Sequence, residues 1–189
     1  MKYVRRFLWF TASRLLIFSL IVSVLILGFY VSMYGANIYI LLSDGMAART
    51  HTILTREDAE DLINYFRADT LESDETLAVA LSSDSPYIYY NITDYECHVG
   101  LEWVWCWPWE DTAQAVISYR VTDIHGSVVA GKQQLVRQGQ LTASPPDWVN
   151  SGRYSVTLYR VDGRWKIAGL IQTQVFSEPT PIPAAGAPV

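Results

Sequence analysis

The sequence predicts an α+β protein in which an N-terminal transmembrane helix precedes a curved antiparallel sheet of about four to five strands, with helices packed on one face of the sheet. Three observations lead to this prediction. An uncharged, almost wholly apolar run extends from Leu15 to Ser43. Helical periodicity follows it as far as about residue 67. From Pro86 onward, apolar and polar residues alternate as they do in strands.

The apolar run is long enough to cross a bilayer. About 20 apolar residues, each rising about 1.5 Å, span a hydrocarbon core of roughly 30 Å. The charged residues before the run are all basic, and the first charge after it is Asp44. Because cytoplasmic flanks tend to be basic, residues 1–14 are predicted to be cytoplasmic. Residues 15–42 then form the transmembrane helix and its extension, in the cell (inner) membrane, and residues 43–175 form an extracytoplasmic domain.

A cleaved signal peptide is the alternative interpretation of the same run. The apolar region of a signal peptide is usually about 7–15 residues long and ends at a small-x-small site. The run is longer here, and Tyr34 stands where a small residue is required. The pattern therefore favours an uncleaved anchor.

Helical periodicity continues beyond the span. Between Asn37 and Ala48, one helical face carries the apolar residues Ile38, Leu41, Leu42 and Met46. A second helix is predicted over Thr55–Arg67, because Thr55 with an acid three residues later resembles a capping box. Its apolar face follows at helical spacing, at Ala59, Leu62, Ile63 and Phe66. Glu72–Leu81 is either a short third helix or an acidic connector.

The remainder of the chain is expected to form strands. Tyr87–His98 and Thr112–Thr122 are the first two, and Ile124-His125-Gly126 is a plausible turn from which Val128–Arg137 returns. Leu141–Gly152 has the composition of a loop. A hairpin around Asp162-Gly163 follows, with strands over Tyr154–Val161 and Trp165–Val175. The Pro-rich segment 176–189 is expected to be a flexible or extended tail.

The last hairpin, YSVTLYRVDGRWKIAGLIQ, resembles the end of the nuclear transport factor 2-like (cystatin-like cone) superfamily. The closing pattern is carried by Tyr159, Asp162, Gly163, Trp165 and Ile167. The resemblance would cover about residues 37–175 and implies a cone-shaped fold. It implies no single function, because that superfamily includes isomerases, dehydratases, binding domains and scaffolds. One anchor followed by such a domain is also similar in architecture to inner-membrane assembly proteins of type IV secretion and conjugation systems.

Charge and motifs exclude several functional classes. The segment after the span contains nineteen acidic and ten basic residues. Nucleic acid is therefore not an expected partner, since phosphate contacts require a basic surface. The bilayer, contacted through the anchor, and other membrane-protein subunits are the expected partners, and a small ligand is a further candidate. The chain has no nucleophile elbow, phosphate loop, dinucleotide fingerprint or zinc signature. We therefore expect no cofactor and no metal.

Weak candidates for proton transfer lie on one strand. Enzymes of the fold that the chain resembles carry an acid or a histidine in the cone, and Asp94, Glu96 and His98 share one parity here. The alternative is that this face is simply solvated. Cys97 and Cys106 would form a disulfide in an oxidising compartment, or would be small buried hydrophobic residues with alternate facings.

Tryptophan is concentrated in the segment LEWVWCWPWED, where four of the seven tryptophans stand on every second residue. In a regular strand all four would share one face. Three interpretations remain open: a core beneath the helices, a docking surface for a protein or the bilayer interface, or a platform that stacks a sugar or quaternary ammonium ligand. A mixture is also expected, with the inner pair packed and the outer pair available. The residues are Trp103, Trp105, Trp107 and Trp109.

Together these features favour a non-catalytic accessory or assembly subunit of a membrane-bound protein complex. The first alternative is an envelope-facing module that binds a small ligand or sugar. The second is an isomerase- or dehydratase-like enzyme that uses Asp94, Glu96 or His98.

Overall fold

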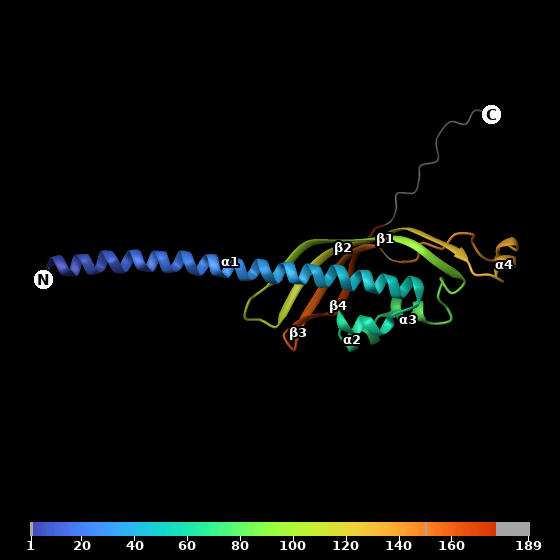
Figure 1. The fold of residues 1–189 in the computed structure, drawn as a ribbon, viewed down its shortest axis with the longest axis horizontal. Coiled ribbons are helices and arrows are strands. Elements are labelled where there is room, and N and C mark those ends of the chain that lie inside the picture. The colour runs from blue at the N-terminus through green and yellow to red at the C-terminus, as the bar shows by residue number, and fades with distance from the viewer. Residues whose placement is uncertain (1, 150, 177–189) are drawn as a thin grey trace, which may run out of the picture.

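The structure, a computed structural model, describes residues 2–149 and 151–176, without the side chains of residues 2–8 and 13. It confirms the α+β class: a long N-terminal helix, a curved four-stranded antiparallel sheet and a few short helices (Figure 1). Most of the Pro-rich tail, from residue 177, lies outside the described residues.

Helix α1 spans Lys2–Thr55 without a break over 54 residues. Its N-terminal half projects beyond the sheet (Figure 1), and most of its large apolar side chains between Trp9 and Met33 are exposed. By length and composition alone, this helix could cross a membrane. From Ile38 onward the same helix enters the core, where Ile38, Leu42 and Met46 are fully buried. The predicted continuation of the helix beyond the apolar run is therefore confirmed.

The sheet has the strand order β1-β2-β3-β4, with every neighbouring pair antiparallel. The strands are β1 Tyr90–Cys106, β2 Thr112–Val128, β3 Gly152–Val161 and β4 Arg164–Val175. Helix α1 packs on the inner face of the sheet, to which β2 contributes the predicted alternating set. That set is Ala113, Ala115, Ile117, Tyr119 and Val121, all buried.

The prediction of a second helix over Thr55–Arg67 is wrong. Helix α1 ends at Thr55, whose hydroxyl donates to the carbonyl of His51 in the same helix rather than beginning a new one. The chain then reverses through Arg56 and Asp58, both with positive φ (65° and 56°). A short 3₁₀ helix, η1 (Ala59–Asn64), and two short helices, α2 (Ala68–Glu72) and α3 (Glu75–Leu81), follow. Part of the ambiguous segment is therefore helical.

The turn predicted at Ile124-His125-Gly126 is also wrong, because β2 continues through it to Val128. Gly126 lies opposite Ile92, and a Cβ there would lie 2.7 Å from the carbonyl oxygen of Asn91. The glycine thus permits close approach of the β1 backbone and does not mark a reversal. Instead of a returning strand, the following segment contains the short helix α4 (Gln133–Arg137).

The Asp162-Gly163 hairpin forms as predicted between β3 and β4. Both turn residues have positive φ, 50° and 78°, as a two-residue type I′ turn requires. On the far side of β4, Phe66 forms a parallel bridge to Ile167, which ties the segment after η1 to the sheet edge.

A buried ion pair joins α1 to α3. Arg49 donates two hydrogen bonds, of 2.6 and 2.9 Å, to the carboxylate of Asp74, and the two side chains are 8% and 13% exposed. Asp74 also caps α3 by accepting from the backbone N–H of Leu77. Burial alone would raise the pKa of Asp74, but the hydrogen bonds and the charge of Arg49 outweigh it, so this pKa lies below its ordinary value.

Replacing Asp74 with alanine is expected to destabilise the domain by about 3–5 kcal/mol, because the buried Arg49 then loses its counter-charge. Asp69→Ala is the matched control, since it removes the acid of an exposed pair with Arg67 and should cost about 0–1 kcal/mol. Denaturant unfolding at neutral pH measures both losses. Equal losses in the two variants would contradict this role for the buried pair.

The same carboxylate predicts a loss of stability in acid. Its folded-state pKa lies below the ordinary 3.8, so its stabilising contribution is present above about pH 4 and disappears as the pH falls through the folded-state value. Below about pH 4 the wild type should therefore lose stability more steeply with falling pH than Asp74→Asn does. Parallel stability–pH curves for the two proteins would refute the linkage.

Candidate functional site

The facing of the tryptophans is decided by a β-bulge in β1. From Tyr95 to Leu101, after two earlier register shifts, the odd-numbered residues of this strand face the core. The register shifts between Leu101, opposite Ile117, and Trp103, opposite Val116, so Glu102 is an extra residue. Such a shift exchanges the faces of the sheet on which the odd-numbered and even-numbered side chains lie. Beyond the bulge, Trp103 and its odd-numbered neighbours therefore lie on the outer face, away from α1.

The four indoles form a continuous ladder. Trp103 and Trp105 lie parallel with ring centroids 6.4 Å apart. Trp105 meets Trp107 edge-to-face at 5.2 Å, and Trp107 stacks on Trp109 at 4.9 Å. Edge-to-face and stacked contacts in this range are favourable for aromatic rings. The ladder thus continues from the outer face of β1 into the connection between β1 and β2.

The ladder is exposed, which removes the core interpretation. Trp103, Trp105 and Trp109 are 47%, 52% and 68% exposed, and Trp107 is half-buried. The expected mixture, with an inner pair packed in the core, is wrong for the same reason. The alternation itself is confirmed, since the intervening Val104 packs against the core and Cys106 is buried. A docking surface and a ligand platform remain.

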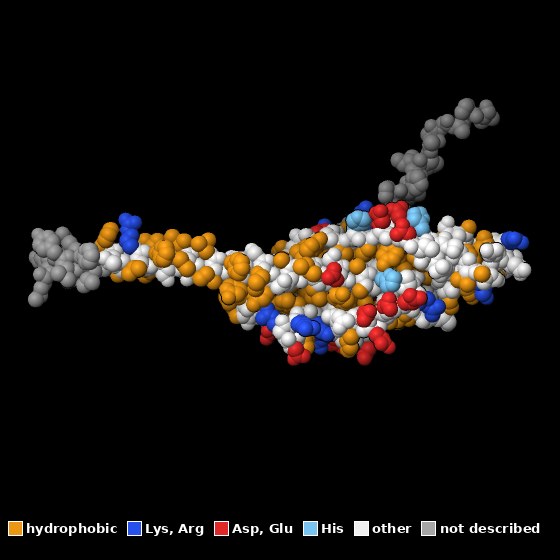
Figure 2. Space-filling view, in the orientation of Figure 1, with side chains coloured by type: hydrophobic (Ala, Val, Ile, Leu, Met, Phe, Trp, Pro, Cys, Tyr) orange, Lys and Arg blue, Asp and Glu red, His pale blue; other side chains and the backbone are white. Residues whose placement is uncertain are grey.

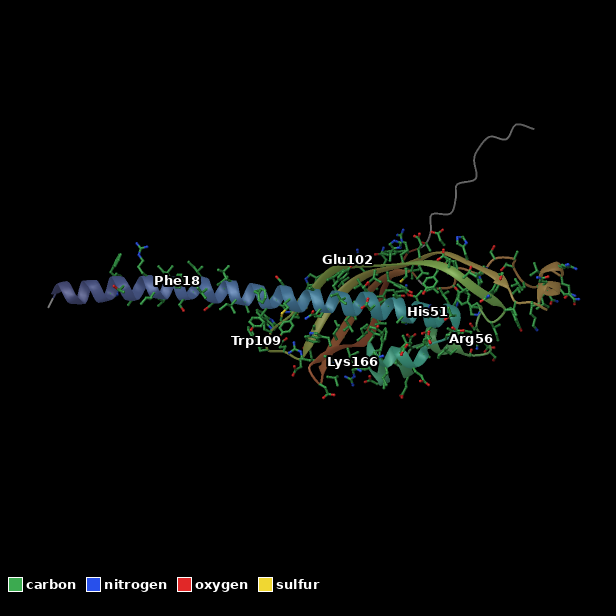
Figure 3. The ribbon with its side chains drawn as sticks, in the orientation of Figure 1. Phe18, His51, Arg56, Glu102, Trp109 and Lys166 are labelled. Carbon is green, nitrogen blue, oxygen red and sulfur yellow. The ribbon has the colours of Figure 1, made fainter. Side chains whose placement is uncertain are left out.

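The outer end of the ladder lies close to α1, near the place where the helix leaves the domain. A Cβ at Gly35 would lie 3.6 Å from the side chain of Val104. Arg160 extends this link: its guanidinium lies 4.8 Å from the ring centroid of Tyr34, and its backbone N–H donates to the carbonyl of Asp111 at 2.8 Å. Figure 3 places Trp109 at the same end of the domain, beside the exposed half of the helix.

The three candidate acid–base residues are exposed rather than enclosed. Asp94, Glu96 and His98 lie on β1, opposite His125, Thr122 and Arg120 respectively. Register shifts on both sides of Asp94 disturb the parity that would align it with the other two. Among the described residues, neither Glu96 nor His98 has a hydrogen-bond or ion-pair partner. Their proposed proton-transfer role stays a prediction.

Cys97 and Cys106 carry free thiols. Both lie on β1, where nine steps of about 3.3 Å separate their α-carbons by about 30 Å, far beyond the reach of a disulfide. The bulge places both side chains toward the core, so the alternate facings expected from their numbers are wrong. Burial raises the pKa of both thiols, and the hydrogen bond between Cys97 and the Thr50 hydroxyl only partly opposes it at Cys97.

A second candidate site lies on the inner side of the sheet, and the sequence pattern did not predict it. A hollow of about 370 Å³ opens between β4 and the short helices α2 and α3, with Arg49 and Asp74 in its wall. Two buried polar atoms that line it, the Oγ1 of Thr70 and the Nε2 of Gln172, have no hydrogen-bond partner among the described residues. Buried polar atoms are usually satisfied, so this hollow offers hydrogen-bonding capacity to a ligand.

The only sequence signal for that hollow is an arginine on an apolar helical face. Arg49 follows Met46 by three residues and precedes Ile53 by four, and both of these are buried. A buried arginine requires a partner, but the sequence does not say which of the nineteen acids supplies it.

No protein-family model, curated protein or solved structure matches this chain. The resemblance to the nuclear transport factor 2-like superfamily therefore remains a prediction. Within residues 2–149 and 151–176, no group of three or more His, Cys, Asp or Glu side chains is arranged to hold a metal ion.

Alkylation without reductant is expected to modify two cysteines per unfolded chain and to proceed slowly at Cys97 and Cys106 in the folded protein. Ser127→Cys is the matched control, because residue 127 is exposed on β2 and a thiol there should react rapidly. Intact-mass spectrometry over time measures both rates. A disulfide-linked chain, or native thiols as reactive as the control thiol, would contradict the structure.

Proposed function

We propose that the protein is a non-catalytic accessory or assembly subunit of a membrane-bound complex. In this proposal α1 crosses the cell (inner) membrane with its N-terminus in the cytoplasm, and the sheet domain lies on the extracytoplasmic side. The observation that carries the proposal is the exposed, parallel indole pair Trp103 and Trp105 on the outer face of β1.

Several features of this pair support a protein partner. Tryptophan is favoured at the centres of protein interfaces, because one side chain supplies a large apolar area and an N–H donor. The pair lies on an edge strand, and the salt bridge between Glu102 and Arg153 (2.8 Å) borders it. An apolar centre with a charged border is the usual composition of an interface.

An enzymatic function has less support from the geometry. The acid–base candidates lie on the exposed outer face of β1, where nothing encloses a substrate or excludes water. The ladder, by contrast, is already assembled by contacts among the four indoles themselves. Its exposed area is available without rearrangement of the domain.

The proposal predicts that the full-length protein, purified in mild detergent, brings a stoichiometric set of membrane proteins with it. Trp103→Ala/Trp105→Ala should lose those partners, because the two indoles supply the apolar centre of the contact. Ile171→Ala is the matched control, since Ile171 is also large and exposed (66%) but lies on the opposite edge strand, β4. Mass spectrometry of the co-purified proteins provides the measurement.

A wild-type protein that purifies as a clean monomer would contradict the proposal. So would unchanged partner recovery by the tryptophan variant. A thermal unfolding transition equal to that of the wild type would establish that the variant domain remains folded.

A second candidate function is favoured by the inner hollow. Its unpaired Thr70 and Gln172 atoms and its buried ion pair make the lining polar, so a ligand rich in acceptors, such as a sugar, fits it better than an apolar one. The free amide N–H of Gln172 requires an acceptor, and the Thr70 hydroxyl can either donate or accept.

A ligand of the hollow should raise the thermal transition of the full-length protein in detergent. At 100 times its dissociation constant, the stabilisation is about 2.7 kcal/mol. A panel of monosaccharides provides the probes, and Thr70→Val, which preserves the shape but removes the hydroxyl, should weaken the response. Thr157→Val, on the outer face of β3, is the control and should retain the response to the sugar. No shift with any sugar would reject this candidate.

A further inference from the structure

The connection between β1 and β2 lies on the membrane side of the domain if α1 is the span. Strand β1 runs opposite to α1, so residues that follow Val104 lie progressively nearer the N-terminal half of the helix (Figure 1). Val104 is level with Gly35, and Asp111 is linked through Arg160 to Tyr34. The residues between them therefore project past this level, beside the exposed part of α1.

The same level is where the hydrocarbon core should end. Arg14 is the last charge before the apolar run, and about 20 residues from Leu15 cover roughly 30 Å and reach Tyr34. Tyr30 and Tyr34, one helical turn apart with ring centroids 6.4 Å apart, supply the aromatic side chains that favour a membrane–water boundary. Side chains become fully buried in the domain only from Ile38. The projecting connection therefore meets the boundary of the bilayer.

The chemistry of the connection suits that boundary. Trp109 is 68% exposed and stacks on Trp107, while Pro108 between them has no backbone N–H to satisfy. The backbone N–H of Glu110 donates to the carbonyl of Trp107 at 3.2 Å, which closes the turn on itself. An indole has an apolar body and a polar N–H, and such side chains concentrate at headgroup level.

Apolar surface is continuous between the span and the connection. Figure 2 shows hydrophobic side chains covering the free half of α1 and extending onto the adjoining end of the domain. The acids Glu110 and Asp111 follow at the far end of the turn and are exposed. Because they disfavour an anionic surface, the contact depends on the indoles rather than on charge.

We propose that Trp107 and Trp109 rest in the interfacial layer of the bilayer that α1 crosses, as a second, non-spanning membrane contact. The inference goes beyond the subunit proposal and rests only on α1 being the span. It divides the ladder, since the outer pair contacts lipid while Trp103 and Trp105 remain above the membrane. A rigid helix and a second contact beside it fix the rotation of the domain about the helix axis.

The test uses the full-length protein alone in nanodiscs of phosphatidylcholine brominated near the top of its acyl chains, since bromine quenches nearby tryptophan fluorescence. Trp9 is changed to Phe throughout, because it lies at the other end of the span. Trp107→Phe/Trp109→Phe should lose most of the lipid-dependent quenching. Trp103→Phe/Trp105→Phe, the matched pair from the same ladder, should retain it.

Quenching that persists in the first variant, disappears in the second or is absent in the parent would overturn the inference. The measurement contains no other protein, so a failed subunit proposal leaves its result unchanged. Incorporation into the nanodisc is read separately from co-elution with the lipid, and a chain that does not incorporate would overturn the premise that α1 spans.

Discussion

One unbroken helix determines the rest of the structure. From Leu15 to Tyr34, helix α1 is almost wholly apolar around its circumference. Farther along, its buried apolar side chains form a stripe that begins at Ile38 and continues through Met46 to Ile53. An apolar surface all round suits a lipid environment, whereas a stripe suits a helix that packs on a sheet. Because α1 is unbroken, the core of the domain is built on the continuation of the apolar run. Every contact near Tyr34 therefore has a defined height relative to the apolar run.

The bulge at Glu102 is the second constraint, and it acts on a single strand. Without the extra residue, the odd-numbered parity that places Cys97 and Leu101 against the core would also place Trp103 there. At the level where Gly35 lies against Val104, four indoles on the inner face would compete with α1 for the space that smaller side chains fill. The bulge removes that conflict by exposing the tryptophans and burying the smaller Val104 and Cys106. The salt bridge from Glu102 to Arg153 holds the extra residue on the outer face.

The sequence predicts the elements in which apolar side chains keep a regular helical or strand spacing. It does not predict the places where a single residue interrupts that spacing. The helical stripe at Ile38–Met46, the alternating β2 and the Asp162-Gly163 hairpin follow from side-chain periodicity and turn chemistry. The capping pattern at Thr55 did not start a helix, because its hydroxyl found an acceptor in the preceding turn. The turn predicted at Gly126 does not form, because the sequence cannot distinguish a reversal from a close approach of two strands. The inner hollow depends on pairing Arg49 with Asp74, a contact across 25 positions that no local pattern encodes.

The two sides of the sheet consequently offer different chemistry. The inner side contains a neutralised ion pair and two polar atoms that have no hydrogen-bond partner in the described part of the chain, which suits a small polar molecule. The outer side presents stacked indoles bordered by a salt bridge, which suit a larger apolar partner. If the outer pair of indoles rests on the membrane, the rotation of the domain is set and the surface at Trp103 and Trp105 keeps a constant direction just above the bilayer. In the proposed subunit role, such a fixed direction would reduce the rotational freedom that is lost when a partner in the same membrane binds.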